Sequence, residues 1–197
     1  MDLVLGTISF LIITIPIYPY FKDMVTGRAI PSRSTRTMFV VLLVLGLLQQ
    51  KSLGTGMGLW LLTGELIGSI FVFFASLKYG EGGLSKIDIY CYLLLILDIG
   101  VWAVTKNALI AVFLTMTADI IALAPTVAKL MRNQKSETYL WWLFGVIAPV
   151  FSVLSEGSFE LKKVLFQTYL LFANLAIVLL IVVPRSKNIK SEVATND

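Results

Sequence analysis

The chain has 197 residues, of which 57% are hydrophobic and only 14% charged, with a formal net charge of +4. Soluble domains are about 45–50% apolar and about 25% charged, so this composition calls for a lipid environment. With no histidine and one cysteine, His-ligated metal sites, Ser-His catalytic triads and internal disulfides are excluded. The composition predicts an all-α integral membrane protein that is not an enzyme and has no cofactor.

Seven long apolar runs follow one another along the chain, and each predicts a transmembrane helix, since helices satisfy their backbone polar groups internally in lipid. The runs cover residues 3–20, 37–50, 59–79, 87–104, 108–127, 139–154 and 164–183. One helix needs about 20 residues to cross the hydrocarbon, so seven spans leave room only for short loops. The first run lacks the basic start and cleavage site of a signal peptide, so we expect it to be retained.

Lysine and arginine are distributed unevenly between the loops. Twelve lie in the segments after the first, third, fifth and seventh runs, and four lie in the other loops. Cytoplasmic loops carry the excess of positive charge, so the N-terminus is predicted outside the cell membrane and the C-terminus in the cytoplasm. The same distribution accounts for the net charge without a nucleic-acid partner, and the polar tail at 185–197 is predicted to be disordered.

Two of the basic loops are alike in sequence. The first reads PYFKDMVTGRAIPSRST from Pro19, and the loop after the fifth run reads PTVAKLMRNQKSET from Pro125. Eleven residues beyond the threonine that opens the next run, the chain reaches Gly46 in the second run and Pro149 in the sixth. Glycine and proline weaken a helix locally, so these four residues are predicted hinges at matching positions.

The matching loops predict an internal repeat of three helices. Because three helices reverse the direction of the chain, a second copy in the same orientation requires one additional span between the copies. The fourth run supplies that span. We therefore predict a first repeat over residues 1–79, a linker helix over 80–106 and a second repeat over 107–184, an arrangement of 3 + 1 + 3 helices.

In these loops and hinges the chain resembles the SWEET and PQ-loop superfamily of small seven-helix transporters, which are built from parallel repeats. The family signature is Pro-Gln at the end of the first helix of each repeat. Here Pro19 and Pro125 supply the prolines, but neither is followed by glutamine. A family hinge proline in the second helix is matched by Pro149 and replaced by Gly46. The resemblance implies a facilitator with a solute site between two three-helix bundles.

Three acidic residues lie deep in the predicted spans, namely Glu65, Asp98 and Asp119. A charged residue at the centre of a lone helix costs about 2.5–3.5 kcal/mol, and no lysine or arginine lies deep in the runs to pair with them. Protonation, a cationic ligand or a water-filled cavity must therefore offset the cost. Asp119, with Asp98 near it, is the candidate for proton or cation coupling, and interhelical hydrogen bonding is the structural alternative.

Polar residues on two helix faces are the candidates for solute contact. Glu65 shares a stripe of small residues with Gly68, a stripe suited to lining a cavity or to close helix packing. Gln167 and Asn174 share a face of the seventh run, and the repeat places Asn174 opposite Glu65. In the resembled family the third helix of each repeat contributes a polar residue to the solute site, which is where Glu65 and Asn174 fall.

Tryptophans add a further set of candidates. Trp102 lies four residues after Asp98 and therefore on the same face, so the pair suits a sugar, a nucleoside or a cationic solute. Trp60, Trp141 and Trp142 lie near the ends of their runs, where tryptophan usually anchors a helix at the membrane interface.

The sequence therefore predicts a multipass transporter that moves a small polar solute, of sugar, nucleoside or amino-acid size, by alternating access. Its expected partners are the lipid bilayer and the solute, with proton coupling and homo-oligomerisation left open. The alternative is a membrane receptor or accessory subunit with the same helical fold and no net transport.

Overall fold

The computed structural model describes residues 1–31, 33–80, 84–134 and 137–183, and the predicted disordered tail at 185–197 lies outside these ranges. Within them the chain is helical and contains no β-strand. The helices are α1 (Asp2–Thr14), α2 (Ile17–Val25), α3 (Arg33–Ser52), α4 (Leu59–Tyr79), α5 (Lys86–Thr105), α6 (Ala108–Arg132), α7 (Tyr139–Ser155) and α8 (Leu161–Val182).

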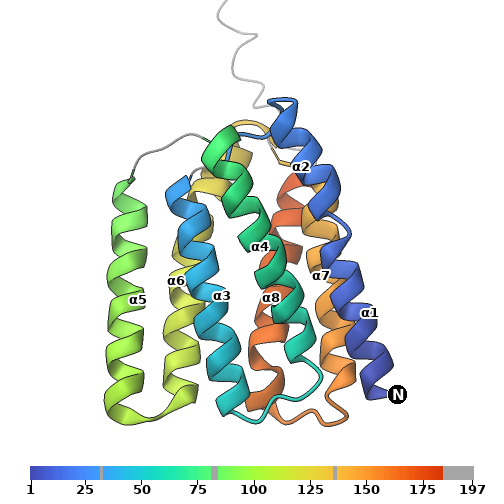
Figure 1. Ribbon diagram of the computed structural model, residues 1–197, viewed down its shortest axis with the longest axis vertical. Helices are drawn as coiled ribbons and strands as arrows, with labels where there is room; N and C mark the ends of the chain where they lie inside the picture. The colour runs from blue at the N-terminus through green and yellow to red at the C-terminus, as the bar shows by residue number, and fades with distance from the viewer. Residues whose placement is uncertain (32, 81–83, 135–136, 184–197) are drawn as a thin grey trace, which may run out of the picture.

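Five helical segments are long and apolar enough to cross a membrane. They are Asp2–Val25, which joins α1 and α2, together with α4, α5, α6 and α8. The shorter α7 is also apolar. The helices run side by side in one bundle (Figure 1). One end carries residue 1 and the α3–α4, α5–α6 and α7–α8 connections, and we call it the N-terminal end. The other end carries the two similar loops, and we call it the basic end.

The first predicted run differs from the helices that form. The helix breaks at Ile15 and Pro16, and α2 then continues through Pro19 to Val25. Proline has no backbone N–H and cannot extend the hydrogen-bond ladder of a preceding turn, and at Pro16 this effect separates α1 from α2. Likewise α6 continues through Pro125 to Arg132, beyond the predicted end at residue 127. Pro19 and Pro125 therefore lie within helices instead of ending them.

The helices form two groups that contact each other through their outer members. In the first group α4 packs against both α1 and α3, and in the second α8 packs against both α6 and α7. The groups meet where α1 packs on α7 and where α3 packs on α6. Helix α5 lies at one edge of the bundle, against α6 and α3 (Figure 1).

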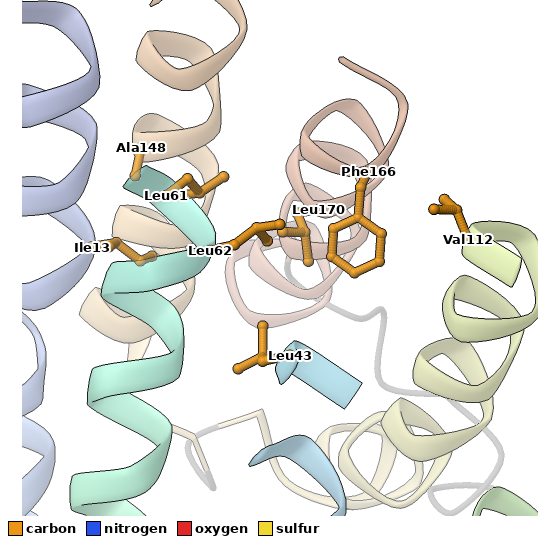
Figure 2. Packing of buried hydrophobic residues seen from close by; sticks show 8 residues of the cluster. All are labelled: Ile13, Leu43, Leu61, Leu62, Val112, Ala148, Phe166 and Leu170. Atoms are coloured by element: carbon orange, nitrogen blue, oxygen red, sulfur yellow. The ribbon is translucent and has the colours of Figure 1, made fainter. Parts of the chain in front are cut away.

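A central apolar cluster holds the two groups together. It takes one or two residues from each of α1, α3, α4, α6, α7 and α8, as Figure 2 shows: Ile13, Leu43, Leu61, Leu62, Val112, Ala148, Phe166 and Leu170. A second cluster joins α3, α5 and α6 around Met38, Cys91 and Ala122. We call the first cluster the apolar floor, because four of its residues also line the cavity described below.

Glycines permit the closest helix contacts in the bundle. A Cβ added at Gly64 would lie 2.5 Å from Ile13, and one added at Gly68 would lie 3.1 Å from Ile17, so α4 packs closely on α1 and α2. At the predicted hinge Gly46, an added Cβ would lie 3.1 Å from the ring of Phe166. The absence of a side chain at Gly46 therefore serves the packing of α3 on α8.

Candidate solute-binding cavity

A cavity of about 830 Å³ lies between the two groups of helices. Every helix except α5 contributes to its wall. The wall also includes residues of the two basic-end loops, among them Arg28, whose side chain is 64% exposed. The cavity therefore opens at the basic end. Its volume lies within the range of about 300–1,000 Å³ that small-molecule sites occupy.

Three of the predicted site residues meet in this cavity. Glu65 comes from α4, Asp119 from α6 and Asn174 from α8, so both groups of helices contribute. The Tyr169 hydroxyl donates a hydrogen bond of 2.6 Å to Oδ2 of Asp119. No hydrogen-bond donor in the described part of the chain contacts the carboxyl group of Glu65, which lies close enough to Asp119 for their charges to interact. The wall thus presents two carboxyl groups, and of these Asp119 has a hydrogen-bond donor, the Tyr169 hydroxyl.

The position of Asn174 depends on a glycine of the neighbouring helix. A Cβ added at Gly145 of α7 would lie 2.4 Å from Oδ1 of Asn174. The Nδ2 atom of Asn174 donates to the backbone oxygen of Leu170 at 2.8 Å. Pro149, a predicted hinge, is buried within α7 four residues after Gly145. Because proline has no N–H to donate to the carbonyl four residues earlier, the helix is weakened where Gly145 lines the cavity.

Charged and aromatic side chains surround the mouth of the cavity. Arg28 forms an ion pair of 3.0 Å with Asp23, whose other oxygen accepts a hydrogen bond of 3.0 Å from Thr138 Oγ1. The guanidinium group of Arg36 lies 5.1 Å from the ring centre of Tyr20 and donates to its hydroxyl. Both cationic groups of the wall therefore have partners within the protein.

Two tryptophans of α7 also belong to the wall. Trp141 packs against Tyr20 in a tilted arrangement, with ring centres 5.0 Å apart and ring planes at 41°. The Nε1 atom of Trp142 is buried and has no hydrogen-bond partner among the described residues. The sequence pattern favoured an interfacial anchor for both residues, whereas the structure places them in the cavity wall. Because this nitrogen atom is buried, it does not reach the open space of the cavity.

Asp98 lies away from the cavity, in a hydrogen-bonded cluster that joins three helices. Its side chain is fully buried and accepts from Gln49 Nε2 at 3.0 Å. The hydroxyl of Thr115 lies 2.5 Å from Oδ2 of Asp98 and 2.8 Å from Oε1 of Gln49. This geometry ties α5 to α3 and α6, which corresponds to the structural alternative for a buried acid. Trp102, one turn further along α5, is not among the cavity-lining residues either.

Gln167 likewise faces the protein interior instead of the cavity. It is fully buried, and neither atom of its amide group has a hydrogen-bond partner in the described ranges. A Cβ added at Gly58 would lie 2.8 Å from its Nε2 atom. Phe166, its neighbour in α8, lines the cavity. Gln167 therefore lies just beyond the apolar floor, toward the N-terminal end.

Sequence reasoning did not single out Pro16 or Tyr169, both of which shape the site. Pro16 lines the cavity at the break between α1 and α2, and a proline in the middle of an apolar run is the signal that indicates it. Tyr169 lies well inside an apolar run, whereas tyrosine is enriched near the ends of membrane helices, and this position is the signal for a polar partner inside the bundle.

Neither a metal cluster nor a known family accounts for this site. Among the described residues, no group of three cysteine, aspartate or glutamate side chains is placed to hold a metal ion. No protein-family model matches the chain, and it has no match among the curated proteins or the solved structures. The functional argument therefore rests on the arrangement of the side chains.

Proposed function

We propose that this chain is a membrane transporter that moves a small polar solute by alternating access, with the cavity as its solute site. The observation that carries the proposal is the composition of the cavity wall. A space of about 830 Å³ between two groups of helices presents Glu65, Asp119 and Asn174 from opposite groups. Polar groups that converge in a large concave pocket are the usual features of a small-molecule site.

The packing of the helices supports the proposed 3 + 1 + 3 arrangement. If α1 with α2, α3 and α4 correspond to α6, α7 and α8, then each main contact has a counterpart. In both groups the third helix packs on the first and the second, and the first helix of each group packs on the second helix of the other. Helix α5 is left as the linker. This pattern favours parallel repeats and the resemblance to the SWEET and PQ-loop transporters.

The charge distribution supports an assignment of the conformation. The basic end carries most of the lysine and arginine residues, so the positive-inside rule assigns it to the cytoplasm. The cavity opens at this end and is closed by the apolar floor toward the other end. We therefore interpret the conformation as inward-facing.

The two carboxyl groups of the cavity indicate that the solute, or an ion transported with it, carries a positive charge. Arg28 and Arg36 are the cationic residues of the wall, and both lie at the mouth with partners of their own. Deeper in the cavity, no cationic side chain of the described residues balances the charges of Glu65 and Asp119. A solute with a protonated amine, or a proton carried along with a neutral solute, would balance them.

A stabilisation screen on the purified protein tests the proposal. Representative sugars, nucleosides, amino acids and organic amines are added, and the midpoint of thermal unfolding is measured. We expect one class to raise it and Glu65→Gln to abolish the effect, because the wall then loses a negative charge that the solute would balance. Glu160→Gln, which removes an acid from the exposed α7–α8 connection, serves as the matched control.

Flux measurements separate transport from the alternative. Vesicles that contain the protein should take up the stabilising solute, and Asn174→Ala should slow this uptake. Stabilisation without flux would favour a receptor. An absence of stabilisation by all four classes would contradict a solute site.

A further inference from the structure

The N-terminal end of the bundle is closed by a contact between two connections of the chain. Both carboxyl oxygens of Glu156, at the end of α7, lie 3.0 Å from the backbone nitrogen of Gly56, and Oε1 also accepts from the nitrogen of Gly58 at 2.6 Å. The Ser152 hydroxyl donates to the carbonyl oxygen of Gly58 at 3.1 Å. The α3–α4 connection is thus bound to α7, that is, one group of helices to the other.

Glu156 lies at the N-terminus of α4. Gly58 is the N-cap residue of α4, and the first N–H groups of the helix bond to backbone oxygens of the preceding residues. The carboxylate from the other group accepts from the N–H groups of Gly56 and Gly58 just before the helix, where its negative charge is favourable at the positive end of the helix dipole. Hydrogen bonds to a charged acceptor are stronger than neutral ones. Glu156 is therefore the charged acceptor among the contacts at this end, which also include a hydrogen bond of 3.0 Å from Thr55 Oγ1 to the carbonyl oxygen of Lys163 in α8.

Near this contact, three buried polar atoms have no hydrogen-bond partner among the described residues. Both amide atoms of Gln167 and the Nε2 atom of Gln50 make no hydrogen bond with the described residues. Both side chains are fully buried. Leaving such groups unsatisfied is costly, and the cost disappears when water reaches them. We call the contact of the Glu156 carboxylate with Gly56 and Gly58 the latch. The latch stabilises the closed end, whereas the free-energy cost of the unsatisfied polar atoms favours opening.

The same contact lies next to the only barrier that we identify between the cavity and this end of the described bundle. Leu61 and Leu62 of the apolar floor begin one turn after Gly58. Phe166 lines the cavity, whereas its neighbour Gln167 lies against Gly58. A displacement of α4 away from α7 would therefore expose Gln167 and the floor together.

We propose that Glu156 is the gating residue of the N-terminal end. Release of its carboxylate from Gly56 and Gly58 separates the two connections and opens a second route to the cavity. This inference rests on the proposed alternating-access function, which requires the closed end to open. Gln167 then becomes a polar residue of the opened route.

Thiol labelling tests the gate without any knowledge of the solute. Ser152→Cys places a reporter beside Gly58, and Ser152 is fully buried in the closed state. The native Cys91 is also fully buried, in the cluster around α5, and it reports loss of the fold in the same molecule. The purified protein is treated with a polar maleimide, and modification of each cysteine is followed by mass spectrometry of its peptide.

Two variants break the latch in different ways. Glu156→Gln removes the charge of the acceptor. Gly58→Ala keeps the charge but adds a Cβ 2.5 Å from Oε1 of Glu156, which forces the contact apart. The matched controls are Glu160→Gln, an acid of the same connection, and Gly56→Ala, whose added Cβ would lie at an ordinary 3.8 Å from Glu156. Both controls should keep the latch closed.

In both latch variants we expect the reporter at position 152 to react about tenfold faster than in the parent, with Cys91 still protected and the controls unchanged. Unchanged reporter rates in both latch variants would overturn the gate, as would equal gains at the reporter and Cys91, which indicate unfolding. Neither of these outcomes would argue against solute binding in the cavity. Conversely, the screen could find no stabilising solute while the latch variants are labelled faster. That result would overturn the proposed transport function but would support opening of the N-terminal end.

Discussion

Asp98 and Asp119 are both acids in the middle of apolar helices, but their surroundings differ. Asp98 is fully buried between α5, α3 and α6, where Gln49 and Thr115 contact it. Asp119 accepts one hydrogen bond, from Tyr169, and faces a cavity that reaches the basic end of the bundle. The partners of an acid, more than its depth in the sequence, thus distinguish a packing group from a group available to a ligand.

The largest effect is expected from removal of the packed acid. Asp98→Ala leaves Gln49 and Thr115 without their shared acceptor, and buried groups that lose a partner in this way are destabilising. We expect the free energy of unfolding to fall by roughly 2 kcal/mol, near the upper limit for interhelical hydrogen bonds in membranes. Chemical unfolding in one detergent measures this, with Asp119→Ala as the comparison. Equal losses for both variants would contradict the distinction between the acids.

A second effect should appear on the cavity side alone. Gly145→Ala introduces a Cβ 2.4 Å from Oδ1 of Asn174, so the amide must leave its position in the wall. For the solute identified by stabilisation, we expect affinity to fall about tenfold, equivalent to about 1.4 kcal/mol. Gly100→Ala in α5 is the control, because nothing lies within 4 Å of the added Cβ. Unchanged affinity would remove Asn174 from the site.

The third prediction separates the chemical role of Asp119 from its packing role. Asp119→Asn keeps an oxygen that accepts from Tyr169, so the free energy of unfolding should change by less than about 1 kcal/mol. The variant can no longer exchange a proton, and the pH dependence of solute uptake into vesicles should be lost. Identical pH profiles for the parent and the variant would exclude Asp119 from coupling.

The smallest effect belongs to an acid at the surface. Hydrogen bonds from Lys162 and then from Lys163 hold the pKa of the Glu160 carboxyl below its usual value. A depressed pKa stabilises the folded state above the unfolded pKa, and this contribution is lost as pH falls through the folded pKa. Because Glu160 is exposed, Glu160→Gln should barely shift the unfolding midpoint between pH 7 and pH 3. A shift as large as that of Asp98→Ala would contradict the ranking.

Much of the helical layout follows from the sequence because apolar runs and helix formation are coupled in lipid. The runs at 59–79 and 139–154 correspond closely to α4 and α7. The ends of α2 and α6 were harder to predict, because a helix passes Pro19 and Pro125 and continues into polar residues. Hydropathy marks where a span leaves the apolar region, whereas helical hydrogen bonding continues until capping or turn geometry ends it.

The candidate site was predictable in part. Glu65 and Asn174 were paired by the repeat, and the cavity brings them together with Asp119. Trp102 and Asp98 were joined by spacing along one helix, but spacing fixes only a shared face and does not say which neighbour that face meets. Helix α5 turns Asp98 toward α3 and α6 instead of the cavity. Which neighbouring helix a given face packs against cannot be predicted from a single sequence.

The hydrogen bond from Gly58 to Glu156 couples two positions that are 98 residues apart in the chain. While a carboxylate is present at 156, position 58 accepts no larger residue than glycine, since an added Cβ would lie 2.5 Å from the oxygen. Loss of the acid removes one part of that restriction, but the Nε2 atom of Gln167, 2.8 Å from the same added Cβ, keeps the other part. Over evolutionary time a larger residue at position 58 should therefore appear only together with a change at position 156 and a smaller side chain at position 167.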